Sequence, residues 1–454
     1  MIRPIITVLL VLGATVPIGA QDAPLTLEQA VATALENNPN VLAAEADAAA
    51  ASTTRREARG FRLPSVDLTQ SYTYTDNPAE VFALTLNQGR FDMDQFFGSD
   101  PNAPDALSTF ITRLEVTQPI YTGGMIGTRN DQASLMAEAA DLEARHTREK
   151  VAFETATAFA NATKAAEHLT VVRRARDTTA AHVDLARTYA DQGLIVTAEV
   201  LNAQVHLARM EEMVAEAEAQ VTLAQAALNL HLGLPQTTRH ELAQLPPAPP
   251  VEGAAAAWID SATQQRLDLS ARRAELEAGR LEEKAARASF WPEVGVKGSY
   301  DLYDDTLFGS NGHSGSVMAF ARVNLYRGGS DTARTEKAAL TTRSGEERIR
   351  LFSEAVQLET RQAWELRHTA GRRQETAAAA VEAAREAMRV REQRFSQGLD
   401  KMIDLLDAET ALHESELREL VARYDLILST YQLYFASGSP LATRLGGAAE
   451  GDAK

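Results

Sequence analysis

The chain has 454 residues, no cysteine and a formal net charge of −17. Without cysteine it has no disulfide, thiolate metal site, cysteine nucleophile or lipid attached through cysteine. Its acidic balance argues against nucleic acid as a partner.

The first 20 residues have the pattern of a signal peptide. Arg3 supplies a positive charge, residues 5–16 are mostly apolar, and Ala20 ends a segment suited to cleavage. A first transmembrane helix is the alternative, but the apolar run is too short to span a bilayer. No later stretch has 18 consecutive apolar residues. We therefore expect an exported protein that is secreted, periplasmic, or held in an outer membrane as β-structure.

The rest of the chain repeats itself at a constant offset of 205 residues. Gly-Gly at 123–124 recurs at 328–329, Gln-Gly-Leu at 192–194 recurs at 397–399, and Leu-Asn-Ala-Gln at 201–204 recurs as Leu-Asp-Ala-Glu at 406–409. A period this long indicates a duplicated domain half rather than a solenoid repeat. The predicted organisation is a first repeat over 21–245, a proline-rich linker over 246–253, a second repeat over 254–438 and a flexible tail over 439–454.

Each half begins with helices and then changes to strands. Helical stretches over 26–62 and 254–290 end at Leu63-Pro64 and Trp291-Pro292. Apolar and polar residues then alternate, which predicts strand hairpins over about 64–120 and about 292–325. The offset is 228 residues at the prolines, so the first half has 23 extra residues, which fit a loop over about 87–107.

The two faces of these strands differ. Tyrosines on the apolar face suit a lipid interface, and charges on the polar face need water or a lumen. Two soluble hairpins packed on helices would show the same alternation, so the strands alone leave both interpretations open.

Very long helices favour the membrane interpretation. Residues 124–191 and 329–397 contain no proline, and at 1.5 Å per residue each would extend roughly 100 Å. Each is followed by a Gln-Gly-Leu break and a second helix with a heptad seam, which predicts helical hairpins over about 124–233 and about 329–437. Glu419 interrupts the second seam, where we expect Leu420 to take its place. Four glycines are expected to let strand turn into helix: Gly123, Gly124, Gly328 and Gly329.

Four strands cannot close a barrel, and open strand edges cannot stand in lipid. Several copies must therefore combine, and three would give 12 strands, an even number as bacterial barrels require. We predict an α+β membrane protein with a duplicated half and four transmembrane β-strands per chain. As a trimer it would form a 12-strand barrel, continued by a long periplasmic α-helical coiled-coil barrel.

At this point the chain resembles the TolC family of outer-membrane efflux proteins, also called outer-membrane factors. The resemblance covers roughly 25–438 and depends on the order of short motifs. These are Leu-Thr-Leu-Glu-Gln-Ala at 25–30, Asn-Pro at 38–39, Arg-Leu-Glu-Val-Thr-Gln-Pro at 113–119, Tyr-Thr-Gly-Gly at 121–124, Tyr-Arg-Gly-Gly at 326–329, and the segments 193–204 and 398–409.

The resemblance implies a function in transport. The chain would be a homotrimeric exit duct in the outer membrane, serving a tripartite efflux or type I secretion system. It would be a passive channel, opened when a periplasmic adaptor (membrane fusion) protein and an inner-membrane transporter dock. We expect no enzyme activity, no catalytic residue, no cofactor and no metal. A soluble periplasmic coiled-coil adaptor or scaffold is the alternative.

Two aspartates are the candidate entrance constriction. Asp404 and Asp407 are three residues apart, so on a helix they share a face. In a trimer each would form a ring of three carboxylates, a usual cation filter, and the resemblance implies that such residues narrow the periplasmic entrance. A solvated polar face is the alternative.

Other residues near the helical turns are candidates by resemblance alone. Glu199 matches a position where the family can place a gate carboxylate. Phe395 lacks the hydroxyl of the family's usual aromatic residue, and Asp400 stands where the family can place an arginine. Lys401 would supply the positive charge in place of that arginine. All three residues are therefore possible gate contacts. The turns themselves would dock the adaptor through Gln192, Gly193, Leu194, Gln397, Gly398 and Leu399. The alternative is that they are ordinary turns with no binding function.

Overall fold

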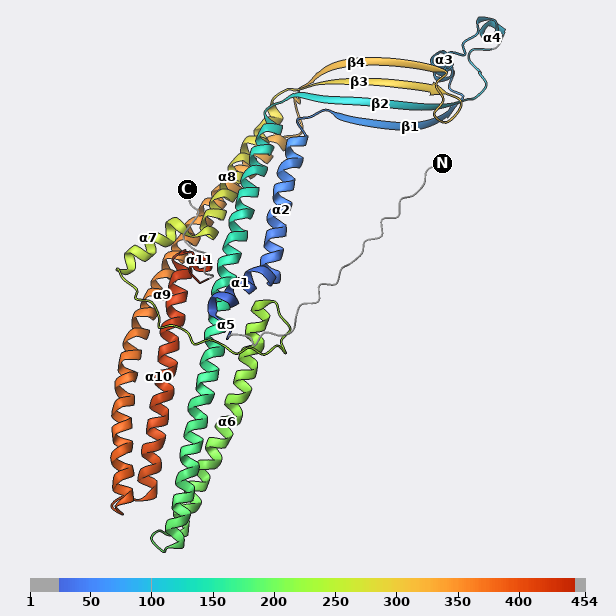
Figure 1. Ribbon diagram of the computed structural model, residues 1–454. Helices are drawn as coiled ribbons and strands as arrows, with labels where there is room; N and C mark the ends of the chain where they lie inside the picture. The colour runs from blue at the N-terminus through green and yellow to red at the C-terminus, as the bar shows by residue number, and fades with distance from the viewer. Residues whose placement is uncertain (1–23, 99, 446–454) are drawn as a thin grey trace.

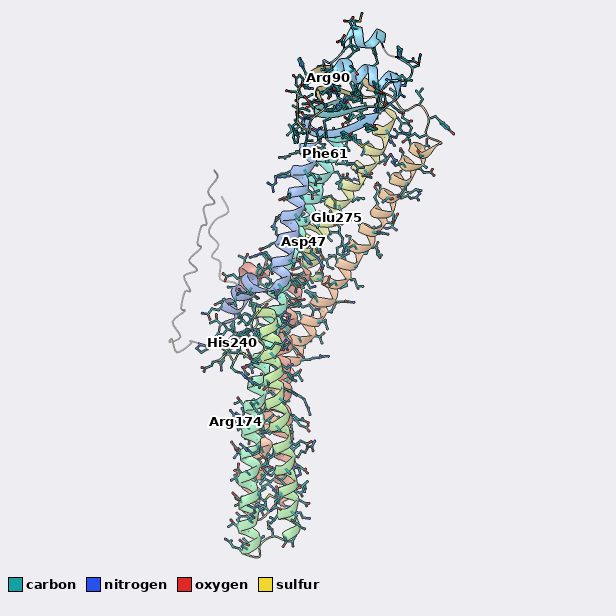
Figure 2. The ribbon with its side chains drawn as sticks, turned by 90° about the vertical axis from the view of Figure 1, so that its right-hand side faces the viewer. Asp47, Phe61, Arg90, Arg174, His240 and Glu275 are labelled. Atoms are coloured by element: carbon teal, nitrogen blue, oxygen red, sulfur yellow. The ribbon has the colours of Figure 1, made fainter. Side chains whose placement is uncertain are left out.

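The computed structural model describes residues 24–98 and 100–445. The predicted signal peptide and residues 446–454 lie outside this range. A four-stranded sheet stands at one end of an elongated molecule, and two long helical hairpins extend to the other end (Figure 1). In the turned view, Arg90 lies at the sheet end and Arg174 lies far along the hairpins (Figure 2).

Two pairs of short helices occupy the middle of the molecule. They are α1 (Leu27–Asn37) with α2 (Pro39–Gly60), and α7 (Ala255–Gln265) with α8 (Leu267–Arg287), followed by the single turn η1 (Ala288–Phe290). Thr26 and Gln29 cap α1 reciprocally, and the Asn38 side chain accepts the Asn40 amide while Pro39 begins α2. This N-cap and proline chemistry explains why the helices begin where they do.

The sheet is antiparallel throughout, in the order β1 (Ser65–Thr75), β2 (Leu107–Thr122), β3 (Glu293–Asp304), β4 (Gly312–Arg322). The pairing of β2 with β3 joins the two halves of the chain. On one face Arg113 Nε lies 2.7 Å from Asp301 Oδ1, and Lys297 Nζ lies 2.7 Å from Glu115 Oε1. The other face is apolar and exposed, with Val66, Leu68, Tyr72, Leu114, Val116 and Val317.

Two glycines join strand to helix in each half. Gly123 and Gly124 have φ of 64° and 83°, and Gly328 and Gly329 have φ of 62° and 79°. Two successive residues in the left-handed region are accessible mainly to glycine, so the backbone turns sharply between β2 and α5 (Met125–Asp191) and between β4 and α9 (Ser330–Ser396). The four glycines therefore lie where each half of the chain passes from strand to long helix.

The hairpins are α5 with α6 (Thr197–Leu232), and α9 with α10 (Met402–Ala436). Helices α5 and α9 have 67 residues each, so each is roughly 100 Å long. One hydrophobic cluster lies where α1, α5, α6 and α10 meet, and a second lies near the far turns. None of the described helices combines the length and apolar character needed to cross a membrane.

The structure differs from the sequence prediction in two segments. The stretch expected as a loop over about 87–107 contains the short helix α4 (Met93–Gly98), and α3 (Pro78–Asn87) lies just before it, within the segment predicted as a strand hairpin. The tail, expected to be flexible from residue 439, instead forms α11 (Leu441–Leu445), because Leu441 is fully buried and the Ala442 amide donates to Glu149. Leu420 is buried in the seam beside Glu419, as expected.

Candidate functional site

The two hairpin turns at the far end of the molecule have the same geometry. In the first, the Leu194 amide donates to the Tyr189 carbonyl at 2.9 Å, and in the second the Leu399 amide donates to the Arg394 carbonyl at 3.0 Å. Gly193 and Gly398 both have φ of 70°. These are Schellman-type helix ends, which leave Leu194 and Leu399 65% and 62% exposed. Each turn therefore presents a large apolar side chain to solvent.

Phe395 belongs to the interior of this end of the molecule. Its ring is buried and stacks on Tyr189 of the other hairpin, with centroids 5.7 Å apart. Met402, Leu405 and Leu406 pack in the same cluster. The side chain that the sequence suggested as a gate contact thus joins the two hairpins of one chain.

Asp400 is held inside its own turn. Its carboxylate accepts from Arg394 Nε at 2.9 Å and from Arg391 Nη1 at 3.0 Å, and only 5% of the side chain is exposed. The Arg394 hydrogen bond, followed by that from Arg391, lowers the pKa of Asp400. Asp400 therefore uses both of its oxygens within the chain.

The two candidate entrance aspartates lie on the first turns of α10. Asp404 is partly covered, and its Oδ2 accepts from the Lys401 amide at 3.1 Å, which satisfies a free N–H at the helix start. Asp407 is exposed, as is the Lys401 side chain. Leu405, Leu406 and Glu409 between and beyond them are buried, so the aspartates face away from the packed side of α10.

Glu199 stands at the corresponding place on α6. Its side chain is partly covered, and Oε2 is buried without a hydrogen-bond partner in the described part of the chain. A carboxylate oxygen in this condition is costly unless a donor reaches it. Within one chain the structure thus brings Phe395 and Asp400 into the second turn, leaves Asp407 and Lys401 exposed, and leaves Glu199 partly covered.

A buried polar cluster lies slightly further from the turns, between α5 and α10. His182 Nδ1 is 2.9 Å from Glu409 Oε2, and Thr179 Oγ1 donates to Glu409 Oε1 at 2.7 Å. Sequence reasoning missed this cluster because its members come from different halves of the chain. The only signal in the sequence was the carboxylate of Glu409, which is placed beside the apolar seam of the second hairpin.

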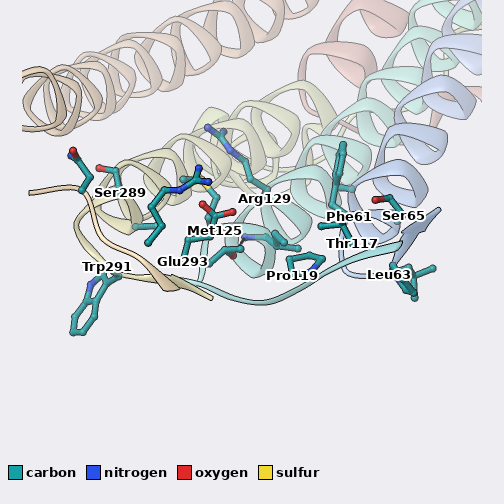
Figure 3. Close-up of a pocket in the computed structure, with 18 of the residues that line it drawn as sticks. Phe61, Leu63, Ser65, Thr117, Pro119, Met125, Arg129, Ser289, Trp291 and Glu293 are labelled. Atoms are coloured by element: carbon teal, nitrogen blue, oxygen red, sulfur yellow. Dashed lines mark hydrogen bonds between the residues drawn. The ribbon is translucent and has the colours of Figure 1, made fainter. Parts of the chain in front are cut away.

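A cavity of about 1060 Å³ lies where the sheet meets the helices. Figure 3 shows Trp291 directed away from the helices and Arg129 lying on the helical side, where it pairs with Glu282. The lining contains no histidine. Across the residues that the structure describes, no cluster of three potential ligands could hold a metal ion.

The family model for outer membrane efflux proteins matches residues 30–234 and 258–439, one segment in each half of the chain. The chain belongs to the outer membrane efflux protein family. The two matched segments coincide with the duplicated halves, and the break between them contains the proline-rich linker. Members of this family are outer-membrane channels and not enzymes, as we predicted from the sequence.

Individual relatives agree with this membership. The outer membrane protein TolC of Vibrio cholerae is 24% identical over 89% of both chains. The alkaline protease secretion protein AprF of Pseudomonas aeruginosa is 22% identical over 89% of this chain and 82% of its own. The crystal structure of the Campylobacter jejuni CmeC outer membrane channel superposes with a TM-score of 0.79 at 15% identity, covering 91% of this chain and 86% of that one. This likeness confirms the predicted fold of the single chain.

Proposed function

We propose that the protein is the trimeric outer-membrane exit duct of a tripartite efflux or type I secretion system. One observation carries the proposal. A sheet with one apolar face, one charged face and two outer edges continues through glycine turns into two hairpins roughly 100 Å long. Open edges are not tolerated in lipid, so β1 of one copy would pair with β4 of the next.

Three copies would place the apolar faces toward lipid and the pairs Arg113–Asp301 and Lys297–Glu115 toward a lumen. The same threefold arrangement would array six hairpins into a tube that crosses the periplasm. The exported substrate would move passively through it, and no catalytic group is needed for that movement.

The periplasmic end would be the entrance. Asp404 and Asp407 would form rings of three carboxylates, since both lie away from the buried side of α10, with Asp404 partly covered and Asp407 exposed. Glu199 and Lys401 would make gate contacts between chains, whereas Phe395 and Asp400 would support the gate from within the turn. The turns at Gln192–Leu194 and Gln397–Leu399 would dock a periplasmic adaptor, which brings an inner-membrane transporter.

The proposal is tested by expressing the full chain in a Gram-negative host and fractionating the membranes. We expect a protein that resists carbonate extraction, runs as a heat-sensitive trimer on a gel, and conducts ions in a planar bilayer. Release by carbonate as a monomer would instead favour a soluble periplasmic adaptor.

A matched pair of variants sharpens this test. Leu114→Lys places a charge on the apolar face of β2, which costs about 2–4 kcal/mol near the middle of a bilayer. Thr117→Lys places the same charge on the polar face of that strand. We expect the first variant to lose the membrane-inserted trimer and the second to keep it; equal behaviour would contradict the assignment of the two faces.

A further inference from the structure

The two halves of the chain have the same strand register. In the first half Ser65 of β1 pairs with Thr117 of β2, and in the second half Glu293 of β3 pairs with Arg322 of β4. The first members of these two pairs are 228 residues apart and the second members are 205 apart, which are the two offsets of the sequence repeat. Strand β1 is therefore the counterpart of β3, and β2 is the counterpart of β4.

The pairing of β2 with β3 consequently has a counterpart that a single chain leaves open. It is the pairing of β4 with β1, and these strands lie at opposite edges of the sheet (Figure 1). The edges are three strand spacings apart, about 14 Å, so they cannot pair within one chain. Strand β1 of a second copy fits beside β4. We call this arrangement the intersubunit strand pair.

One segment at the edge of the sheet lacks the partner that its counterpart has. Residues 118–122 extend β2 beyond its pairing with β1, and there they pair only with β3. Their counterparts, residues 323–327, belong to no strand in the structure. Leu325 and Tyr326 in this segment are 92% and 84% exposed. Strand β1 of the next copy would supply the missing partner.

The observed register of β2 with β3, moved by the two offsets, gives the register of the intersubunit strand pair. Thr117 pairs with Lys297 within the chain. Their counterparts are Arg322 and Thr69, so Arg322 of one copy is placed directly opposite Thr69 of the next. Asp67 of the next copy then lies diagonally across from Arg322, on the same face.

Both of these charged residues are exposed and lack an ion pair in the part of the chain that the structure describes. Arg322 lies 5.9 Å from the ring of Phe320, and it forms no ion pair with Glu293 although the two are in register. Asp67 stands directly opposite Glu115, so two carboxylates face each other. Like charges in this position are destabilising, and a cation on the other side of β1 would offset the repulsion.

The chain already contains an ion pair with the required geometry. Lys297 is two residues before Ser299, which pairs directly with Glu115. Across that diagonal, Lys297 Nζ lies 2.7 Å from Glu115 Oε1. Asp67 is likewise two residues before Thr69, the residue placed opposite Arg322. The same diagonal of an equivalent strand pair would therefore bring the two side chains within reach.

We infer that neighbouring copies are joined by the intersubunit strand pair in this register, with Arg322 of one copy bound to Asp67 of the next. The inference rests on the proposed trimeric duct. Residues 323–327 extend β4 along β1 of the next copy. The charge pair lies on the charged face of the sheet, because Asp67 is opposite Glu115. Three such pairs do between copies what Lys297 and Glu115 do within each chain.

Cysteine crosslinking tests the register, because the chain has no native cysteine. Arg113 pairs with Asp301, so the register places Met318 opposite Thr73 of the next copy. The full-length Met318→Cys, Thr73→Cys protein, purified in detergent, is treated with a short bis-methanethiosulfonate reagent and denatured without reductant. We expect most of it to run as crosslinked dimers and trimers. The control Met318→Cys, Thr69→Cys moves one thiol about 13 Å along β1 and should stay monomeric.

Exchange of charges tests the ion pair. Arg322→Glu alone and Asp67→Lys alone each bring like charges together across the intersubunit strand pair. We expect each to lower the temperature at which half of the heat-sensitive trimer band is lost. The double variant Arg322→Glu, Asp67→Lys should recover most of that shift. The matched control Arg322→Glu, Glu293→Arg exchanges charges within one chain and should not recover it.

The trimer band separates this inference from the proposed function. A trimer that crosslinks through residue 69 as strongly as through residue 73, or through neither, overturns the register and leaves the duct standing. A wild-type chain that forms no trimer overturns both. If the double-cysteine proteins do not assemble, the charge exchange decides. Recovery by Asp67→Lys supports the pair, whereas unchanged single variants, recovery by Glu293→Arg or recovery by neither change overturns it.

Discussion

His182 and Glu409 meet between the two long hairpins, with 2.9 Å between the ring Nδ1 and the carboxylate Oε2. Both residues are 8% exposed, and the second carboxylate oxygen accepts the Thr179 hydroxyl. His182 belongs to the first repeat and Glu409 to the second, so this polar contact fixes how α5 and α10 lie against each other. The counterpart of Glu409 in the first repeat is Gln204, which is only partly covered.

Replacing Glu409 should destabilise the hairpin pair. Glu409→Ala leaves the His182 imidazole and the Thr179 hydroxyl without their shared acceptor in a buried place. We expect the free energy of unfolding to fall by about 2–4 kcal/mol. Thermal unfolding followed by circular dichroism measures the change. The control Gln204→Ala should cost less than about 0.5 kcal/mol, and a similar loss in both variants would contradict the argument.

His413, one turn further along α10, should make the protein sensitive to mild acid. It is buried, neither ring nitrogen has a hydrogen-bond partner among the residues that the structure describes, and burial lowers its pKa below the ordinary 6.5. The charged groups facing it are Glu409, Glu414 and Glu416 of its own helix, and His168 of α5. The unfolded chain therefore binds a proton more readily than the folded chain, so stability rises with pH.

The resulting stability is fully present above pH 6.5, and is lost as the pH falls from 6.5 toward the lowered pKa of the folded state. His413→Phe removes this titration. We expect the unfolding temperature of the variant to fall less between about pH 7.5 and about pH 5.5 than that of the wild type. An unchanged pH dependence would show that other groups govern acid stability.

Neutralising the entrance aspartates should weaken cation block. With Asp404→Asn and Asp407→Asn together, the proposed trimer would lose six carboxylates at its proposed entrance. We expect block of single-channel conductance by a trivalent cation to weaken at least about tenfold. The control is Asp184→Asn on α5, which removes an exposed carboxylate at a similar distance from a turn. Unchanged block in the double variant would rule out the carboxylate rings.

Asp400 should keep the second turn closed to proteases. Asp400→Ala removes the common partner of Arg391 and Arg394, both of which are about half exposed. Because both arginines are half exposed and can be solvated without their partner, we expect little change in overall stability but faster tryptic cleavage at the second turn. Mass spectrometry of the fragments measures this. Asp191→Ala, at the first turn, should leave the rate of that cleavage unchanged.

The glycine pairs allow backbone strain to be separated from a steric clash. A Cβ at Gly123 would lie 2.6 Å from the Ala288 carbonyl oxygen, whereas a Cβ at Gly328 would meet nothing within 4 Å. Both residues have positive φ, so Gly328→Ala should cost about 1–2 kcal/mol. Gly123→Ala carries the clash as well, and should reduce the yield of heat-sensitive trimer much further. Equal yields would show that Ala288 can move away at low cost.

Local patterns in the sequence predicted most of the single-chain fold. The strands, the long helices and the glycine turns are each specified by neighbouring residues: alternation, absence of proline, and paired glycines. Helix α3 was missed although Asn77 and Pro78 form a standard helix start, because the whole of residues 64–120 was assigned to a strand hairpin and its loop. The offset of 205 residues further predicted that the two halves would have the same shape.

The tertiary structure decided which side chains meet. No spacing rule connects His182 with Glu409, 227 residues later, or shows that Phe395 stacks on Tyr189. The sequence also left open that Asp400 would be enclosed by two arginines while Asp407, seven residues away, stays exposed. Local periodicity determines which face of a helix is apolar, but the partner of that face depends on how separate helices rotate and pack, and that is determined by contacts across the whole chain.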